Sequence, residues 1–517
     1  MKFERSKNAI RNVGFSWLNQ IYTMLMPFVI RTVFIYTLGM EYLGLNSLFT
    51  SVLSVLNLAE LGVGRALIFS MYKAIADDDD IKICALMKLY RKYYRIIGLV
   101  ILLAGLVLMP FVPKLIKGTV PDGMNVYILY LINLAATVVT YWLFAYKNSL
   151  ISAYQRSDIS YKISMITITV QYVCQIIALV FLKNYYVFII IMVAIGIVTN
   201  LVTAYVANKL FPSYHPTGSL SKEEVRIINK KVKDLFTSKI GGVVADSVDT
   251  VVISAFLGLT TLAIYQNYFY VVSAVTGFIS VIFNSCLAGI GNSIVTESKE
   301  KNYNDMKKLS FIVFCISTFA VSCMLALYQP FIEIWTGKEN MLGYGYVICF
   351  VVYFYFKQII NLLNVFKDAS GIWHEDRFRP LVGAFSNLIM NLIMVQFWGL
   401  YGVILSTIVS TIVVSIPWII HNLFSILFCR SSKEYIGLEF IFLLFVCVMA
   451  SITTLICINI NFDSLILTMI VRLIVCAVLV SVSILVCFWK KKEFISSVQI
   501  LDSITKGKIK FLSKLIR

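Results

Sequence analysis

The sequence predicts an all-α polytopic membrane protein with fourteen transmembrane helices, and three observations support this fold class. Apolar runs of about twenty residues, long enough to cross a bilayer as a helix, recur along the whole 517-residue chain. The chain is 59% hydrophobic and only 14% charged, with a mean hydropathy of +0.84. Its basic residues gather in the short connections between apolar runs, a distribution that sets the orientation of membrane proteins.

Charge sorting along these runs predicts the topology. With the N-terminus placed in the cytoplasm, most of the 45 Lys and Arg residues fall on the inner side, and only Lys114, Lys117, Lys183 and Lys338 fall on the outer side. Both termini are therefore expected in the cytoplasm of a bacterial plasma membrane. The expected spans are Val13–Tyr36, Leu45–Phe69, Tyr94–Leu115, Val126–Leu150, Ile159–Leu182, Tyr185–Leu210, Leu235–Leu257, Tyr265–Ile294, Leu309–Trp335, Met341–Val365, Leu381–Phe397, Tyr401–Phe428, Ile436–Ile460 and Leu465–Trp489.

Several classes of function are excluded by composition. The net charge of +18 would suit a nucleic-acid binder, but the cations are spread over short loops, so no nucleic-acid partner is expected. Eleven scattered cysteines and three dispersed histidines predict neither disulfides nor a metal site. No cofactor motif or phosphate-binding glycine loop is present, so no cofactor is expected. The first apolar run lacks a cleavage pattern and carries Arg31, which predicts a retained span.

The connections between the apolar runs predict that the chain has five parts. A linker rich in Pro and Gly, residues 211–234, separates an N-terminal six-helix lobe, residues 1–210, from a C-terminal six-helix lobe, residues 235–428. Two additional transmembrane helices occupy residues 429–489. The basic tail, residues 490–517, has apolar residues at helical spacing and is expected to lie on the anionic inner leaflet.

An internal repeat relates the two lobes. Three pairs of segments match in order at nearly one offset, which predicts two lobes related by a pseudo-two-fold axis along the membrane normal. The pairs are TLGMEYLGL at Thr37–Leu45 with FLGLTTLAI at Phe256–Ile264, LGVGRAL at Leu61–Leu67 with AGIGNSI at Ala288–Ile294, and Pro110, Phe111 and Gly118 with Pro330, Phe331 and Gly337.

The repeat predicts a partner for an unusual acid. Asp246 and Asp249 lie three residues apart in the apolar seventh span, so they share a helix face, and carboxylates inside a bilayer need partners or water. The repeat offset places Arg31 of the first span level with Asp249, and the two are predicted to pair across a cleft. Asp246 lies nearer the cytoplasm and has no such predicted partner.

Several segments resemble the polysaccharide transporter family of Wzx-type lipid-linked oligosaccharide flippases, within the multidrug/oligosaccharidyl-lipid/polysaccharide exporter superfamily. They are NLAELGVGRALIFSMYKAIADDD at Asn57–Asp79, VDTVVISAFLGLTTLAIYQNYF at Val248–Phe269, PFIEIWTG at Pro330–Gly337 and FWGLYGVILSTIVS at Phe397–Ser410. The resemblance implies alternating access and a central cationic cavity. It also implies an undecaprenyl-pyrophosphate-type glycolipid substrate, and a polymerase of the same pathway is a candidate partner.

The resemblance implies that the first two helices of each lobe line the cavity. The candidates for contact with the pyrophosphate and the cavity are Arg31, Asn57, Glu60, Arg65, Gln266, Asn267 and Asn284, and those for gating or ion coupling are Asp249, Asp246 and Glu60. A guanidinium suits a pyrophosphate, which favours Arg31 as its ligand. The two aspartates depart from a purely cationic lining.

Each candidate also has a structural interpretation. Arg31 could extend its guanidinium to the outer interface. Asp249 could carry a coupling proton or sodium ion, or hold a structural ion pair, and Asp246 could be simply solvated. Glu60 could pair with Arg65, with Lys239 or with water, and Arg65 itself could be an interfacial anchor. The acidic run Asp77–Asp80 contains a DxD pattern, but a helix-capping turn is the favoured interpretation.

The predicted function is an ion-coupled flippase that moves a polyprenyl-pyrophosphate-linked oligosaccharide from the inner to the outer leaflet, for capsule, O-antigen or exopolysaccharide assembly. A proton- or sodium-coupled small-molecule exporter of the same superfamily is the alternative. An integral-membrane polymerase or glycosyltransferase is a remote third, since such enzymes usually carry a sizeable outer loop and the predicted outer loops are short. The protein is therefore not expected to be an enzyme.

Overall fold

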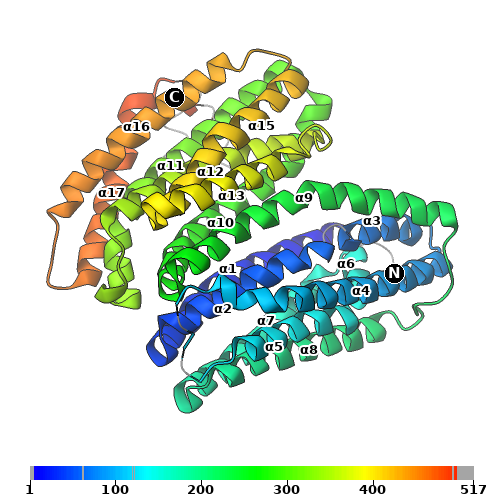
Figure 1. The fold of residues 1–517 in the computed structure, drawn as a ribbon. Coiled ribbons are helices and arrows are strands. Elements are labelled where there is room, and N and C mark those ends of the chain that lie inside the picture. The colour runs from blue at the N-terminus through cyan, green and yellow to red at the C-terminus, as the bar shows by residue number, and fades with distance from the viewer. Residues whose placement is uncertain are drawn as a thin grey trace. The chain divides into compact units, whose positions relative to one another are not determined.

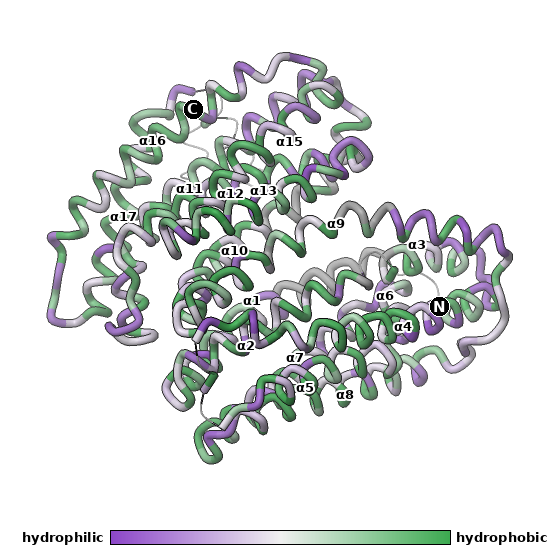
Figure 2. The backbone as a smooth tube through the Cα atoms, viewed as in Figure 1, coloured by the Kyte–Doolittle hydropathy of each residue, from purple (hydrophilic) through white to green (hydrophobic). Residues whose placement is uncertain are grey.

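The computed structural model describes residues 5–60, 63–118, 120–121, 123–491, 494–495 and 497, and within them every regular element is helical. The chain divides into two compact units, Met1–Ala263 and Ile264–Arg517. Figure 1 shows the helices and Figure 2 their hydropathy, with long green stretches broken by purple ends and connections. This confirms the all-α membrane fold class predicted from the apolar runs.

The first unit contains nine helices and the start of a tenth. Their bounds are α1 Arg5–Leu38, α2 Met40–Leu56, α3 Val63–Ala76, α4 Asp80–Leu108, α5 Val126–Trp142, α6 Ala145–Ala153, α7 Ser157–Ile177, α8 Tyr185–Leu210, α9 Lys222–Leu257 and α10 Leu259–Thr296. Within this unit α1 packs on α7, α7 on α8, α4 on α5, and α2 on α9. The second half of the expected linker is therefore the beginning of α9, and the lobe boundaries drawn from the sequence remain predictions.

The second unit is built around α11. It contains most of α10 and then α11 Lys299–Thr336, α12 Tyr344–Ser370, α13 Arg379–Trp398, α14 Leu400–Ser410, α15 Ile416–Asn422, α16 Lys433–Ile458 and α17 Leu465–Phe488. The long helix α11 packs on α12, α16 and α17, so the two helices that lie outside the predicted repeat are joined to the rest through it. Residues 498–517, most of the predicted amphipathic tail, lie outside the described part of the chain.

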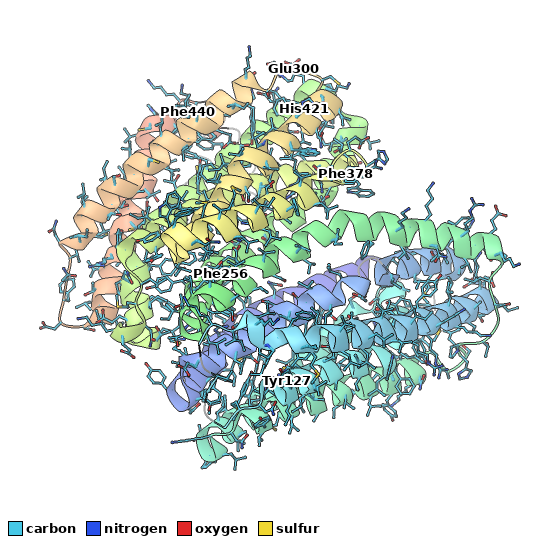
Figure 3. All side chains as sticks on the ribbon, viewed as in Figure 1. Tyr127, Phe256, Glu300, Phe378, His421 and Phe440 are labelled. Atoms are coloured by element: carbon cyan, nitrogen blue, oxygen red, sulfur yellow. The ribbon has the colours of Figure 1, made fainter. Side chains whose placement is uncertain are left out.

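Many apolar side chains of these helices face outward. Phe440 on α16 (Figure 3) is 59% exposed, and Phe385 on α13 is 65% exposed. Rows of exposed apolar side chains on this scale are tolerated where lipid, rather than water, surrounds the helix. Of the described helices, twelve are long and apolar enough to cross a membrane, or up to thirteen if the bent pair α5–α6 is one span.

The expected number of fourteen spans is not confirmed, and two interruptions explain the difference. The expected second span, Leu45–Phe69, is divided into α2, a 3₁₀ turn at Asn57–Glu60 and α3. The expected fourth span is bent by 49° between α5 and α6, where Phe144 adopts a left-handed conformation with φ of 56°. Residues other than glycine rarely adopt the left-handed conformation. A phenylalanine in the sequence therefore does not indicate a bend at this position.

Candidate functional site

The helices α2 and α9 pack side by side in antiparallel orientation and bring several candidate residues into one part of the first unit. At one end a Cβ on Gly44 would lie 2.1 Å from the carbonyl oxygen of Leu259, the first residue of α10 directly after α9 ends, so the backbone there lies against α2. Ten residues further along α2, the hydroxyls of Ser54 and Ser247 lie 2.7 Å apart in a hydrogen bond. The pairing fixes which residues of the two helices share a level.

Asp249 lies on α9 two residues beyond Ser247 and is only 8% exposed, although it carries an acid in an apolar helix. Arg31 lies on α1 and is partly buried. Each side chain interacts with its surroundings. Each helix ends at a glycine in the same unusual conformation, Gly39 with φ of 95° and Gly258 with φ of 92°.

The common ending places the two charges at similar depth. Arg31 precedes Gly39 by eight residues, and Asp249 precedes Gly258 by nine. At 1.5 Å per residue each charge lies about 12–14 Å along its helix from the glycine. Both residues belong to the first unit, so a direct interaction needs no particular arrangement of the two units. The pair itself remains a prediction.

Glu60 lies at the interruption between α2 and α3, where it meets a cluster of tyrosines. Tyr94 on α4 donates a hydrogen bond to Glu60 Oε1 at 2.8 Å, and its hydroxyl lies 2.8 Å from that of Tyr90. Tyr141 on α5 donates to Asn57 Oδ1 at 3.3 Å. We call Asn57, Glu60, Tyr90, Tyr94 and Tyr141 the Glu60 cluster. Its carboxyl group accepts a hydrogen bond from a neutral hydroxyl, which places an acid among three tyrosines.

A glycine makes room for this cluster. A Cβ on Gly64 would lie 2.9 Å from the Tyr90 hydroxyl and 3.2 Å from Glu60 Oε1. The spacing of Asn57, Glu60 and Gly64 along the sequence therefore has a structural counterpart, because each of the three lies against a tyrosine of this cluster. The tyrosines themselves were not among the predicted site residues, and their spacing on α4 and α5 carried no signal beyond an aromatic interior.

In the second unit, α10 carries the remaining described candidates. Asn267 is 1% exposed and Gln266 is partly exposed, and both interact with their surroundings. The neighbouring Tyr268 donates to Gln329 Oε1 at 3.0 Å and accepts from the Leu342 backbone N–H at 2.9 Å. This network joins α10 and α11 to the segment that precedes α12. The side chains of Arg65, Asp246 and Asn284 lie outside the described residues, so their predicted roles stay predictions.

Two polar groups inside apolar helices were missed by the sequence prediction. The first is an amide and hydroxyl network in which Asn387 donates to Thr407 at 2.9 Å, Asn391 donates to Asn387 at 3.2 Å, and Ser406 donates to Asn391. The second is Glu439, an acid in the first turns of α16. Both could have been found from the sequence, since a polar residue inside an apolar run is itself a sign of function or pairing.

Ion pairs outside the spans hold the connections. In the segment before α13, Arg379 is bidentate to Asp376, with both bonds at 2.8 Å, and Asn422 also donates to this carboxylate at 3.3 Å. At the start of α9, Lys82 donates to Glu224 Oε1 at 2.5 Å, and this hydrogen bond holds the pKa of Glu224 at about 2. Ser221 and Glu224 also form a capping box that begins α9.

Within the described residues, no group of three or more His, Cys, Asp or Glu side chains is placed to hold a metal ion. The acidic run does have the capping role expected of it, because Asp79 accepts a hydrogen bond from the Lys82 backbone N–H at 2.9 Å. The candidate site is thus made of buried acids, tyrosines and amides on transmembrane helices, an arrangement typical of transporters that move polar cargo or ions across a bilayer.

Long apolar helices with buried polar groups define a multi-pass membrane protein, and the chain forms two compact helical units. The sequence matches the polysaccharide biosynthesis protein family over residues 9–288, more than half of the chain, and the protein belongs to that family. The match covers the three N-terminal segments of the internal repeat and the whole of α9. No curated protein matches the sequence.

Solved structures share the fold at low identity. The lipid II flippase MurJ in an inward closed conformation has a TM-score of 0.65 at 14% identity, covering 91% of this chain and 99% of that one. An inward-facing multidrug resistance MATE family transporter has a TM-score of 0.58 at 14% identity, covering 80% and 97%. A mutant form of the Vibrio cholerae MATE transporter VcmN has a TM-score of 0.54 at 14% identity, covering 82% and 99%. Family and fold are those of transporters rather than enzymes, as predicted.

Proposed function

We propose that this protein is a flippase that moves a polyprenyl-pyrophosphate-linked oligosaccharide from the inner to the outer leaflet of a bacterial plasma membrane by alternating access. The observation that carries the proposal is membership of the polysaccharide biosynthesis family by a chain with a transporter fold. Lipid II, the substrate named for the similar flippase MurJ, is itself a lipid-linked molecule.

Each unit offers a surface suited to one part of such an amphiphilic substrate. In the first unit, Arg31 is the candidate ligand of the pyrophosphate, with the Glu60 cluster and Asp249 on neighbouring helices. In the second unit, a groove of about 530 Å³ runs between α11, α12 and α16 and is lined almost entirely by apolar side chains, including Val321, Ile348 and Val446. A groove of that size takes several isoprene units of a lipid tail and excludes their apolar surface from the head-group region.

The pairing of Arg31 with Asp249 gives the site a way to open. In the absence of substrate the two charges neutralise each other, since neither is stable alone in a bilayer. A pyrophosphate offers the guanidinium two bidentate oxygens and releases the aspartate, which is then free to take a proton or a sodium ion. Ion binding to Asp249 would then favour return of the empty transporter.

The similarity to multidrug MATE transporters supports a second candidate, an ion-coupled exporter of small molecules. The two functions differ in their assays. A flippase deletion accumulates lipid-linked glycan on the cytoplasmic leaflet and loses surface polysaccharide, whereas an exporter deletion becomes sensitive to drugs with normal polysaccharide. Normal surface polysaccharide in the deletion strain, with no redundant transporter, would overturn the flippase proposal.

The predicted ion pair is tested in the complemented deletion strain. Arg31→Ala and Asp249→Ala are each expected to reduce transport by more than tenfold, and the exchange of the two residues, R31D with D249R, to restore part of it. Glu223→Gln, which removes an exposed acid in the first turn of the same helix, is the matched control and should leave most transport intact. If the exchanged pair is no better than either single variant, the two residues act separately.

A further inference from the structure

A small closed cavity in the second unit contains an acid that the proposed site does not use. The cavity lies between α11, α12 and α16 and is lined by Ser310, Ser317, Tyr355 and Glu439 together with apolar side chains. Its volume is about 10 Å³, at the lower limit for a single water molecule. A hydrated metal cation does not fit in that space.

The cavity holds an unused hydrogen-bonding group. Ser317 is only 1% exposed, and its hydroxyl has no hydrogen-bond partner in the described part of the chain. Seven residues earlier on the same helix, Ser310 donates to the Tyr435 hydroxyl at 3.5 Å, and both of these hydroxyls interact with the Glu439 carboxyl group. A buried hydroxyl without a partner destabilises the folded protein, so it marks a position where a further donor or acceptor fits.

Several charged groups on the elements around Glu439 are engaged elsewhere. On α11, Lys307 pairs with Glu434 at 3.0 Å, and Lys308 pairs with Asp305 at 2.9 Å. Arg430, before α16, also pairs with Glu434, at 2.8 Å.

The remaining neighbours are α12 and α17. Helix α12 presents the neutral Tyr355 to the cavity, and its nearest lysine in sequence is Lys357. On α17, Arg472 donates to the carbonyl oxygens of Ile460 and Ala326, and at its end Lys490 lies 5.2 Å from the Trp489 ring. Among the described residues, no basic side chain forms an ion pair with Glu439.

We propose that Glu439 is a proton-binding site, in which the protonated carboxyl group is held by the hydroxyls of Ser310, Ser317 and Tyr435. A carboxylate taken out of water without a cation is strongly disfavoured, whereas the neutral acid both donates and accepts hydrogen bonds. The protonated acid supplies the donor that the Ser317 hydroxyl lacks. A proton bound to the carboxyl group needs no additional room in the cavity.

The position of the site gives the proton a function. Tyr355 lines both this cavity and the apolar groove between α11, α12 and α16, so it forms the wall between them. When Glu439 loses its proton, the charged carboxylate attracts the Tyr355 hydroxyl or a water molecule, and the end of the groove changes shape. Proton binding would thus be linked to groove occupancy, an inference that rests on the proposed function, whereas the proton site itself does not.

Infrared spectroscopy of the purified full-length protein tests the proton site directly. We expect a C=O band of a protonated carboxyl group at neutral pH that disappears in Glu439→Gln. The matched control is Glu434→Gln, which removes the exposed acid five residues earlier on the same helix and should leave the band in place. Ser317→Ala keeps the acid but removes one partner, so the band should shift in frequency.

Two outcomes overturn the proposal. One is a protonated-carboxyl spectrum that is unchanged in Glu439→Gln, and the other is a band that Ser317→Ala leaves at the same frequency. Should Glu439→Gln fail to fold, Ser317→Ala and Glu439→Asp give the same decision through the band position.

Transport assays separate this proposal from the proposed function. In vesicles, collapse of the pH gradient should slow glycolipid movement several-fold for the native protein and have less than a twofold effect on Glu439→Gln. If the deletion strain exports polysaccharide normally, the flippase proposal fails while the infrared result stands. If transport is intact but the band is absent, the proton site fails alone.

Discussion

The two copies of the repeat have the same corners but different helices between them. Gly39 and Gly258, 219 residues apart, both join two helices with φ near 95° and ψ near 175°. Between such corners, the first copy is interrupted at Asn57–Glu60, whereas α10 continues for 38 residues through the matching AGIGNSI segment. The corners are therefore set by local glycine chemistry, and the helices between them are set by what they pack against.

The next pair of helices shows the same contrast. Asp79 and Ser298, again 219 residues apart, cap α4 and α11 by accepting from the backbone N–H groups of Lys82 and Lys301. Yet α4 ends at Leu108, before a 3₁₀ segment that contains both Pro110 and Pro113, whereas α11 runs through its single Pro330 to Thr336. The two prolines after α4 remove two backbone N–H groups within a short segment, and the α-helix ends there. The single proline in α11 removes only one, and that helix continues.

The interruption of the first copy coincides with its candidate site. Glu60 is positioned for Tyr94 only because the chain leaves the helix at Asn57 and enters α3 at Val63. Among the described side chains, no acid or tyrosine cluster lies at the matching place on α10, where several others are outside the described set. The functional asymmetry between the copies therefore follows from a local loss of helical geometry in the first one.

A second pair of corners allows the largest test. Asp376 before α13 and Asp158 at the start of α7 lie 218 residues apart, are 2% and 0% exposed, and both pair with arginine. Asp376→Ala should lower the free energy of unfolding in detergent by about 3–5 kcal/mol, because it leaves the buried Arg379 guanidinium without its bidentate partner. Chemical unfolding followed by tryptophan fluorescence measures this loss.

The matched control is Glu375→Ala, which changes the exposed acid next in sequence and should alter the free energy of unfolding by less than about 0.5 kcal/mol. Asp158→Ala should also destabilise the protein, because it leaves Arg156 without the carboxylate to which it donates at 3.1 Å. If the two variants lose the same free energy of unfolding, the two copies of the repeat match in the stability of these ion pairs as well as in their position.

The glycines inside the second helices give the next largest effect. Gly44→Ala should destabilise the protein by about 1–3 kcal/mol, because the added methyl group meets the Leu259 backbone, which cannot move aside easily. Gly289→Ala on α10 is the matched control, with nothing within 4 Å of its Cβ. It should be neutral or stabilising by about 0.5–1 kcal/mol, since alanine favours a helix. The thermal loss of monodisperse protein in detergent distinguishes the two variants, and similar behaviour would contradict the close approach of α2 to the start of α10.

Tyr94→Phe is expected to have a smaller effect on stability and a larger one on transport. It removes the donor to Glu60 and costs about 1 kcal/mol in unfolding free energy. Because the acid then loses its fixed position, transport should fall several-fold. Tyr93→Phe, one residue earlier on α4, removes the hydrogen bond to Asn229 instead and is the matched control. If both variants transport equally well, the Glu60 cluster is not part of the transport site.

The sequence predicts those parts of this protein that depend on composition and local chemistry. The apolar runs located the helices, and glycine and proline spacing located the corners at Gly39, Gly118, Gly258 and Gly337, all of which have φ between 90° and 95°. The break at Asn57, the bend at Phe144 and the cavity around Glu439 depend on which helices meet. Residues far apart in sequence decide those contacts, and no local pattern records them.

The smallest predicted effect concerns Lys82 and Lys301, whose backbone N–H groups donate to the capping residues of α4 and α11. Lys82 pairs with Glu224 on α9, whereas its counterpart Lys301 pairs with Glu297 one turn earlier on its own chain segment, at 2.6 Å.

The Lys82 hydrogen bond holds the pKa of Glu224 at about 2, below that of a free glutamate. The pair therefore stabilises the folded protein above about pH 4.3, and this stability is lost as the pH falls towards 2. Both partners are about one-third exposed, which limits the contribution to about 0.5 kcal/mol. Glu224→Gln should therefore flatten the acid side of the stability curve slightly relative to the native protein. If this variant has the same pH dependence as the native protein, the contact between α4 and α9 adds nothing to the stability.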